Sequence, residues 1–453
     1  MSQDSYELTG DCMNNILPGG KFNEAYRAHL DLIAEYAKLI EGPVLFRPLH
    51  ENTGGWFWWG NTFCTPDTYK SVFKYTVDYM RDVKGIHNFI YLYGPGSEAA
   101  NEAEYEERYP GDGYVDMVGF DSYDDSPNET ENYTFQNDFK NTIRLTNSFA
   151  KKHNKLFAVT ETGIKNPNDK ALLPTGNGRK DWYNEILDIV TDKEFNCCYF
   201  MLWSNYSSSG SYYTPFVVSK NNDDNTLTGH EMLDNFISFY NDQRSIFASD
   251  QKEIILDLES IQKPQNAGKE LDGYITAPVS GNRILDVTNV QAQLNMATDK
   301  EILLTISGNG KNINLETKKD ATGKVYSAVI TKENLNTIGE ALQGKISLYA
   351  DGKLLQEISV IFNVEEKELP AEQVDDFEAY GGLTVLLNNK WSTNKGSGCT
   401  IDISLVEEPR YEGSYALKLN YNETKNGYAG AMIPKEADWS AYNALKFWVK
   451  PDG

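Results

Sequence analysis

The chain reads RPLHENTGGWFWWG from Arg47 to Gly60, and the first three of these residues end an apolar segment, 43–49. Glu41-Gly42 precede that segment and a glycine-rich turn follows it, so we expect a strand over 43–49 with Glu51 just beyond its end. In barrels of alternating strands and helices, the carboxyl ends of the strands carry the chemistry. The stretch therefore predicts a functional carboxylate at a strand end.

Four aromatic residues follow in a row, Trp56, Phe57, Trp58 and Trp59. Such residues are usually core, but this row lies between glycines and has neither strand nor helix periodicity. We therefore expect an exposed aromatic platform beside Glu51. Core packing is the alternative.

Strands and helices alternate around this stretch. Apolar runs predict strands over 43–49, 89–94, 115–121, 156–160 and 197–203, and amphipathic segments predict helices over 21–40, 66–83, 135–152, 180–192 and 231–240. This order predicts an α/β fold with a parallel sheet, of the (β/α)8 TIM-barrel type. Five strands are fewer than eight, so we expect the barrel to be N-terminally incomplete, with the missing units upstream of Met1.

The pattern changes to short β segments after residue 243. Strands are predicted over 302–306, 325–330, 345–350 and 354–362, with Asp351-Gly352 as a hairpin turn, and again over 400–405, 415–421 and 445–449. We expect three domains: a partial barrel over 1–243, an all-β immunoglobulin-like sandwich as a spacer over 265–365, and a partial β jelly roll over 371–453.

Composition excludes several classes of protein. With 66 acidic and 42 basic residues the formal net charge is -24, which argues against nucleic-acid and anionic-membrane partners. The five cysteines lack metal-ligand spacing, so we predict no metal site, no disulfide framework and no cofactor. There is no apolar run of membrane-spanning length.

Glu51 and Glu161 form the candidate catalytic pair. Each follows a predicted strand, and in a closed barrel those two strand ends face each other, which would bring the carboxyls to about 5 Å. Two carboxyls at that distance hydrolyse glycosides with retention of configuration. The rings around Glu51 favour it as the proton donor, and Glu161 would be the nucleophile, held ionised by the Tyr123 hydroxyl. Taken alone, Glu161 could be an ordinary strand end, and His50 and Trp203 could be core residues.

Several motifs carry a resemblance to a known family. They are Ile16-Leu17-Pro18-Gly19-Gly20, the segment 46–60 with His50 before Glu51, Gly119-Phe120-Asp121-Ser122-Tyr123 and Thr160-Glu161-Thr162-Gly163. Together they resemble the β-mannanases of glycoside hydrolase family 26. The ending Tyr93-Gly94-Pro95-Gly96 departs from the family pattern, and the family's upstream strands are missing.

The resemblance implies a role for each matching residue. Glu51 would be the acid/base and Glu161 the nucleophile, with Tyr123 as its partner. The substrate-binding set would comprise His50, Trp56, Trp59, Tyr123, Trp203 and Arg47, with Arg47 supporting the site from below. The C-terminal segment resembles a truncated carbohydrate-binding module, through Asp376-Phe377-Glu378, 415–419 and 439–442.

The expected function is retaining, endo-acting hydrolysis of β-1,4-mannosidic bonds in mannan, galactomannan or glucomannan. Alternatives are a β-1,3-1,4-glucanase of the same family and a non-catalytic polysaccharide-binding remnant. We expect an extracellular monomer whose partner is a plant cell-wall polysaccharide, with a signal peptide upstream of this segment.

Overall fold

The computed structural model describes residues 12–125, 131, 133–165, 172–205, 212–216, 218–221, 223–224, 226–247, 270–366, 369–370, 372–396, 399–423, 427–434 and 438–451. The chain divides into two compact units. The first comprises Met1–Ile90, Glu107–Tyr114 and Glu270–Gly453, and the second Tyr91–Glu106 and Val115–Lys269. The predicted domain boundaries 1–243, 265–365 and 371–453 stay predictions.

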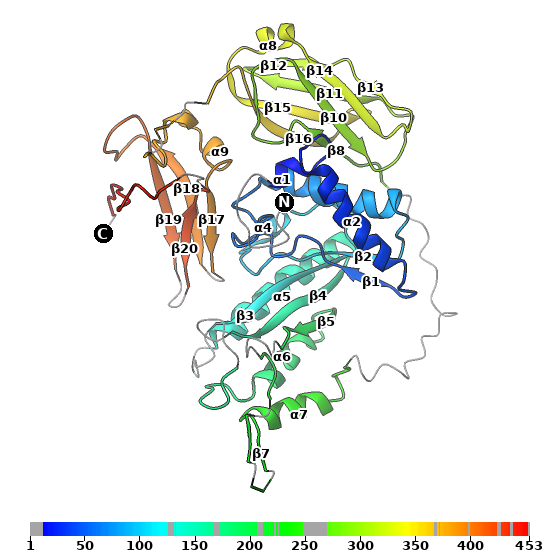
Figure 1. The fold of residues 1–453 in the computed structure, drawn as a ribbon, viewed down its shortest axis with the longest axis vertical. Coiled ribbons are helices and arrows are strands. Elements are labelled where there is room, and N and C mark those ends of the chain that lie inside the picture. Colours follow the sequence, from blue (N-terminus) through cyan, green and yellow to red (C-terminus); the bar gives the residue numbers. More distant parts are fainter. Residues whose placement is uncertain are drawn as a thin grey trace. The chain divides into compact units, whose positions relative to one another are not determined.

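The α/β part of the chain is built on one five-stranded sheet with the order β1-β2-β3-β4-β5 (Figure 1). Its strands are β1 Val44–Phe46, β2 Phe89–Tyr93, β3 Met117–Asp124, β4 Leu156–Ile164 and β5 Cys197–Leu202. The pairs β2–β3, β3–β4 and β4–β5 are parallel. The five strands lie within or across the apolar runs that predicted them, but β1 ends at Phe46, so the predicted strand 43–49 is too long and Glu51 lies further along the loop than expected.

Helices precede, separate and follow these strands in the sequence. They are α1 Cys12–Asn15, α2 Asn23–Ala37, α3 Pro66–Asp78, α4 Glu102–Glu106, α5 Thr134–His153, α6 Trp182–Val190 and α7 Leu233–Asn241. Helix α3 begins with Thr65 as N-cap and Pro66 at its first position, a combination that favours helix initiation. The predicted helix 66–83 changes to a π-helical turn at Tyr79–Val83. A short hairpin, β6 Ser219–Lys220 and β7 Leu227–Thr228, precedes α7.

Strands β3 and β4 extend further than their apolar runs. The register continues past a bulge at Phe120/Asp121, with Asp121 opposite Glu161 and Asp124 opposite Ile164. The prediction that Glu161 follows its strand is therefore wrong, because β4 continues to Ile164. The polar residues there looked like a loop, but parallel pairing with β3 supplies their backbone hydrogen bonds.

Burial differs along the sheet. Every residue of β4 after Leu156 is buried, and β3 is buried except at Tyr123. Helix α5 packs on both strands (Figure 1). Strands β1 and β5, at the two ends of the sheet order, are only half-buried, with Leu45 and Met201 exposed.

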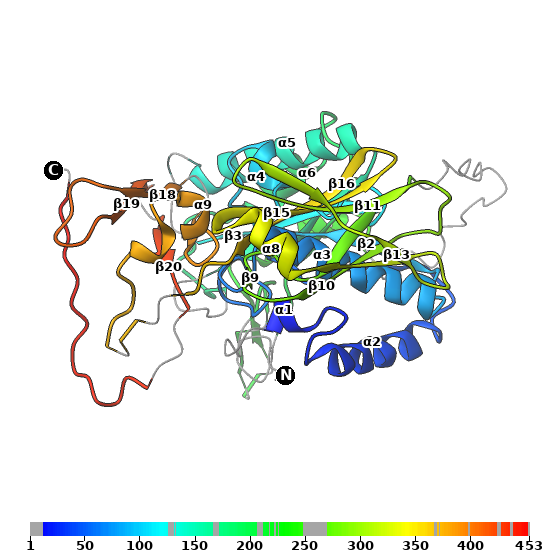
Figure 2. The ribbon, with the colours of Figure 1, turned by 90° about the horizontal axis from the view of Figure 1, so that it is seen from above.

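The sandwich consists of two sheets, green to yellow in Figures 1 and 2. One has the order β13-β14-β10-β8 and the other β12-β11-β15-β16-β9. The strands are β8 Gly273–Ala277, β9 Arg283–Ile284, β10 Thr288–Leu294, β11 Ile302–Gly308, β12 Lys311–Asn314, β13 Lys318–Lys319, β14 Val325–Ile330, β15 Ala341–Ala350 and β16 Lys353–Phe362, with α8 Lys332–Ile338. Inward apolar residues such as Val290, Leu304 and Ile346 form its core. Asp351 and Gly352 both have positive φ, as the predicted hairpin turn requires.

The C-terminal module contains two antiparallel pairs, β17 Ser392–Lys395 with β20 Ala429–Met432, and β18 Thr400–Val406 with β19 Ala416–Asn422. A helix, α9 Thr384–Leu387, packs on β18. The predicted strand 445–449 is wrong, because the described residues there form no strand. Phe447 and Trp448 are exposed, and an apolar run becomes a strand only where a neighbour pairs with it.

Helix α3 contacts the sandwich within the first unit. Lys74 Nζ lies 2.8 Å from Asp272 Oδ2, and the Tyr274 hydroxyl donates to Asp78 Oδ2 at 3.2 Å. Gln356 Nε2 donates to Ser71 Oγ at 3.2 Å. Burial raises the pKa of Tyr274, so its hydroxyl stays protonated and able to donate. These polar contacts dock the sandwich on the helix.

Two further observations concern the whole described chain. No helix among the described residues is long and apolar enough to cross a membrane. All five cysteines are free thiols, and Cys12, Cys64 and Cys399 are buried.

Candidate active site

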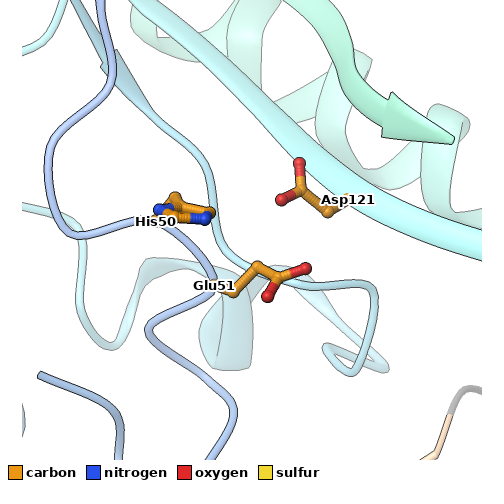
Figure 3. Close-up of side chains that lie close together, drawn as sticks. All are labelled: His50, Glu51 and Asp121. Atoms are coloured by element: carbon orange, nitrogen blue, oxygen red, sulfur yellow. The ribbon is translucent and has the colours of Figure 1, made fainter. Parts of the chain in front are cut away.

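The loop after β1 holds Glu51 in a constrained backbone. Leu49 and Glu51 have φ values of 54° and 47°, in the left-handed region that non-glycine residues seldom adopt. Consecutive side chains, His50 and Glu51, project from this loop (Figure 3). Strained backbone of this kind clusters at functional sites.

Two tryptophans bond to this loop. Trp56 Nε1 donates to Glu51 Oε2 at 2.7 Å, and Trp59 Nε1 donates to the backbone oxygen of His50 at 2.6 Å. The first bond orients the carboxyl group, and the second fixes the peptide before it.

The expectation of an exposed aromatic platform is wrong for two of the four rings. Phe57 and Trp59 are buried, and their rings stack with centroids 4.4 Å apart. Trp56 and Trp58 are half-buried, so only they present aromatic surface to solvent. Gly60 lets the loop fold this tightly, since a Cβ there would lie 2.1 Å from the Gly54 oxygen.

His50 is neutral at physiological pH. Burial, and then the nearby Arg47 charge, lowers the pKa of its imidazole from 6.5 to about 4. The ring packs against Phe57 and Trp59, with centroids 5.0 and 5.8 Å away. A neutral imidazole beside a carboxyl group can donate one hydrogen bond and accept another, as sugar hydroxyls require.

Strands β3 and β4 of the second unit carry the other carboxylates. Glu161 is buried, and the Tyr123 hydroxyl donates to its Oε2 at 2.6 Å. Asp121, on β3 (Figure 3), is also buried and accepts a 2.6 Å hydrogen bond from the Thr160 hydroxyl. A hydroxyl donor steadies the carboxylate that it contacts. Glu161 is thus held in one orientation.

Trp203 follows β5 directly. Its backbone N–H donates to the Thr162 oxygen at 3.0 Å, which fixes the start of that loop beside β4. Its ring is half-buried. Tyr213, further along the chain after β5, packs edge-on against Tyr123, and the two ring centroids are 6.0 Å apart.

The structure groups the predicted residues within each unit. His50, Glu51, Trp56 and Trp59 form one cluster with Arg47 next to it, and Tyr123 and Glu161 form another. The predicted approach of Glu51 and Glu161 to about 5 Å stays a prediction. The first cluster contains an imidazole and a carboxylate, and the second contains a carboxylate, all groups of the kind that ligate metals. The expected absence of a metal also stays a prediction.

Sequence reasoning gave no role to Asp121, Asn52 and Tyr69. Asp121 lies in the motif 119–123, and its alternation with Tyr123 places both on one face of β3. Asn52 and Tyr69 are fully buried and bond to each other, with the Asn52 amide donating to the Tyr69 hydroxyl at 3.1 Å. Spacing alone does not connect a loop residue to a helix residue.

The model of "Glycosyl hydrolase family 26" matches residues 7–214, and that of "Carbohydrate binding domain (family 11)" matches residues 367–453. A mannan endo-1,4-beta-mannosidase of Bifidobacterium adolescentis is 28% identical over 97% of this chain and 44% of its own length. One from Bacillus subtilis is 30% identical over 47% of this chain and 56% of its own. The chain thus spans about half the length of these curated relatives.

A solved structure shares the fold. The modular endo-beta-1,4-mannanase of Cellulomonas fimi aligns with a TM-score of 0.60 at 24% identity, over 79% of this chain and 73% of that chain. The prediction of a (β/α)8-type sheet followed by all-β modules is confirmed. From the motifs of the loop after β1 and of strands β3 and β4, and from the two matching models, residues 7–214 of this chain are similar to glycosyl hydrolase family 26 and residues 367–453 are similar to a family 11 carbohydrate binding domain.

Proposed function

We propose that this chain takes part in retaining, endo-acting hydrolysis of β-1,4-mannosidic bonds, with Glu161 as nucleophile and Glu51 as acid/base. The observation that carries the proposal is the pair of oriented carboxyls. Glu51 accepts a hydrogen bond from Trp56 just after β1, and Glu161 accepts one from Tyr123 near the end of β4. Both strands belong to one sheet, whose carboxyl end carries the chemistry in this architecture.

The chemistry takes two steps. Glu161 attacks the anomeric carbon while Glu51 gives its proton to the departing glycosidic oxygen, so a glycosyl ester forms and the C–O bond breaks. Glu51, now ionised, takes a proton from water, and the resulting hydroxide oxygen displaces Glu161 from the anomeric carbon. Two inversions give net retention. The Tyr123 hydroxyl bond keeps Glu161 aimed throughout.

The polymer is the proposed partner on two grounds. A family 11 carbohydrate binding domain accompanies the hydrolase domain, and the curated relatives are named mannan endo-1,4-beta-mannosidases. We further propose that the chain acts outside the cell, because a polysaccharide does not cross a membrane. We also propose that it acts as a monomer. Neutral His50 and the half-buried Trp56 suit sugar hydroxyls and sugar faces.

The test incubates the chain with linear mannan, galactomannan and mixed-linkage β-glucan, and follows new reducing ends and their anomeric configuration by proton NMR. Release of β-configured oligomers from mannan supports the proposal. Inverted products, or faster cleavage of β-glucan, would contradict it.

Variants separate the two roles. Glu161→Ala should abolish hydrolysis, whereas azide should restore turnover of an activated aryl mannoside by Glu51→Ala, because a small nucleophile replaces the base-assisted water. Glu24→Ala, an exposed carboxylate on α2, is the matched control and should leave the rate unchanged. Full activity of Glu161→Ala would leave polysaccharide binding without catalysis as the function.

A further inference from the structure

The turn that carries Glu51 needs support from outside itself. Leu49 and Glu51 both have positive φ, a backbone conformation that is strained for non-glycine residues. Such a conformation persists only where surrounding contacts fix it. The relevant contacts are those made by the turn 49–52 with the rest of its unit.

One hydroxyl group ties both ends of this turn. Tyr69 Oη donates to the backbone oxygen of Leu49 at 3.0 Å and accepts from the Asn52 amide at 3.1 Å. Tyr69 and Asn52 are completely buried, so water does not compete for these bonds. His50 and Glu51 are the two residues between these attachment points.

Tyr69 is itself held rigidly. It lies in the first turn of α3, where the Thr65 hydroxyl accepts from the Thr68 backbone N–H at 3.2 Å. The Arg108 guanidinium lies over the Tyr69 ring, 5.8 Å from its centroid, and donates to the Cys64 oxygen at 2.8 Å. The ring therefore has little freedom to follow the turn if the turn relaxes.

We propose that Tyr69 is a positioning residue for Glu51. Its hydroxyl fixes the left-handed turn, so that the Glu51 carboxyl group reaches the glycosidic oxygen. This inference rests on the proposed function, in which Glu51 is the acid/base. The residue acts through the backbone of Leu49 and through Asn52, without touching substrate. Misplacement of a catalytic group by about 1 Å can cost about a hundredfold in rate.

The test is Tyr69→Phe in the full 453-residue chain, with two substrates. Mannan has a poor leaving group and needs proton donation, whereas 2,4-dinitrophenyl β-mannobioside has a leaving group that departs without it. The variant should lose about tenfold to a hundredfold in kcat/KM on mannan and less than threefold on the dinitrophenyl substrate. Equal losses on both substrates, or no loss on mannan, would overturn the inference.

Tyr75→Phe is the matched control. Tyr75 lies on the same helix, and its hydroxyl accepts from Asn23 at 2.9 Å, away from the turn. A merely structural effect of losing a buried hydroxyl from α3 would appear in both variants. The ratio of mannan to dinitrophenyl activity should change only in Tyr69→Phe.

A second readout does not depend on activity. The indole N–H groups of Trp56 and Trp59 bond to Glu51 and to the His50 oxygen, so their resonances in 15N–1H spectra report on the turn. Both should shift in Tyr69→Phe and stay in place in Tyr75→Phe. If the wild-type chain cleaves neither substrate, the proposed function fails, and unmoved indole resonances would then independently overturn the positioning role.

Discussion

Lys74→Met tests whether the contact between α3 and the sandwich stabilises the first unit. Lys74 lies on α3 with only 8% of its side chain exposed, and its ammonium contacts Asp272 Oδ2 at 2.8 Å, just before β8. Methionine keeps the buried stem and removes the charge. The variant leaves Asp272 without its cation.

The structure sets the size of the effect. A hydrogen bond to a charged group contributes about 1.5–3 kcal/mol to stability. Removing one partner of a fully buried ion pair costs about 3–5 kcal/mol. The Asp272 side chain is 27% exposed and still accepts a hydrogen bond from the Gly273 N–H at 2.7 Å, so the smaller of these two costs applies. We expect a loss of about 2–3 kcal/mol. Domains of about 150–250 residues shift by about 2–4 °C per kcal/mol, and the first unit is larger, so Tm should fall by about 4–6 °C.

The assay is calorimetry of the wild type, Lys74→Met, Asp272→Asn and the double variant. The two single losses should not add, because both break the same pair. Raising the salt concentration should change the difference little, since the pair is mostly buried. Lys353→Met, which breaks the exposed pair Lys353–Glu270, is the control and should leave Tm unchanged. A shift below about 1 °C for Lys74→Met, with additive single variants, would refute the reasoning.

Three further predictions concern the candidate active site. Tyr123→Phe removes the 2.6 Å hydrogen bond to Glu161 and should lower kcat on mannan about tenfold to a hundredfold with little change in KM; an unchanged kcat would show that the bond is idle in catalysis. The pKa of His50 is 6.5 in the unfolded chain and about 4 in the folded chain, so between pH 4 and 6.5 the unfolded chain binds more protons. The free energy of unfolding therefore falls as the pH is lowered from 6.5 to 4. Tm of wild type should therefore fall more steeply over that window than Tm of His50→Gln, and parallel curves would contradict this. Gly60→Ala places a Cβ 2.1 Å from a backbone oxygen of its own loop and should lower both Tm and activity, whereas Gly113→Ala meets open space and should behave as wild type in the same melting and rate assays.

The strands of the sheet could be predicted because buried parallel strands are continuous apolar runs. Two such runs contain the buried pairs Val118 and Phe120, and Phe157 and Val159. Short apolar runs of this kind favour buried parallel strands. The ends of β3 and β4 could not, since Asp121 and the residues around Glu161 are polar although buried. Their place in the sheet depends on pairing between strands far apart in sequence.

The candidate site was predictable where a motif lies within one short stretch. His50, Glu51 and Trp56 are close in sequence, so their contacts are local. The burial of Trp59 was not predictable, because it depends on the loop folding back until the indole reaches the His50 oxygen. The role of Tyr69 was not predictable for a different reason. A tyrosine on an amphipathic helix indicates core packing, and the partner of its hydroxyl, the Leu49 oxygen, lies 20 residues earlier in the sequence.

The docking of the sandwich on α3 has a consequence for how such chains are inherited and recombined. Ser71, Lys74 and Asp78 are buried polar residues whose partners Gln356, Asp272 and Tyr274 are encoded about two hundred to three hundred codons downstream. A gene fragment that ends before the sandwich would lose these three contacts and would expose the face of α3 that the sandwich covers. Natural shuffling and deliberate domain grafting should therefore keep both segments together as one cassette, and chimaeras joined between them should express poorly.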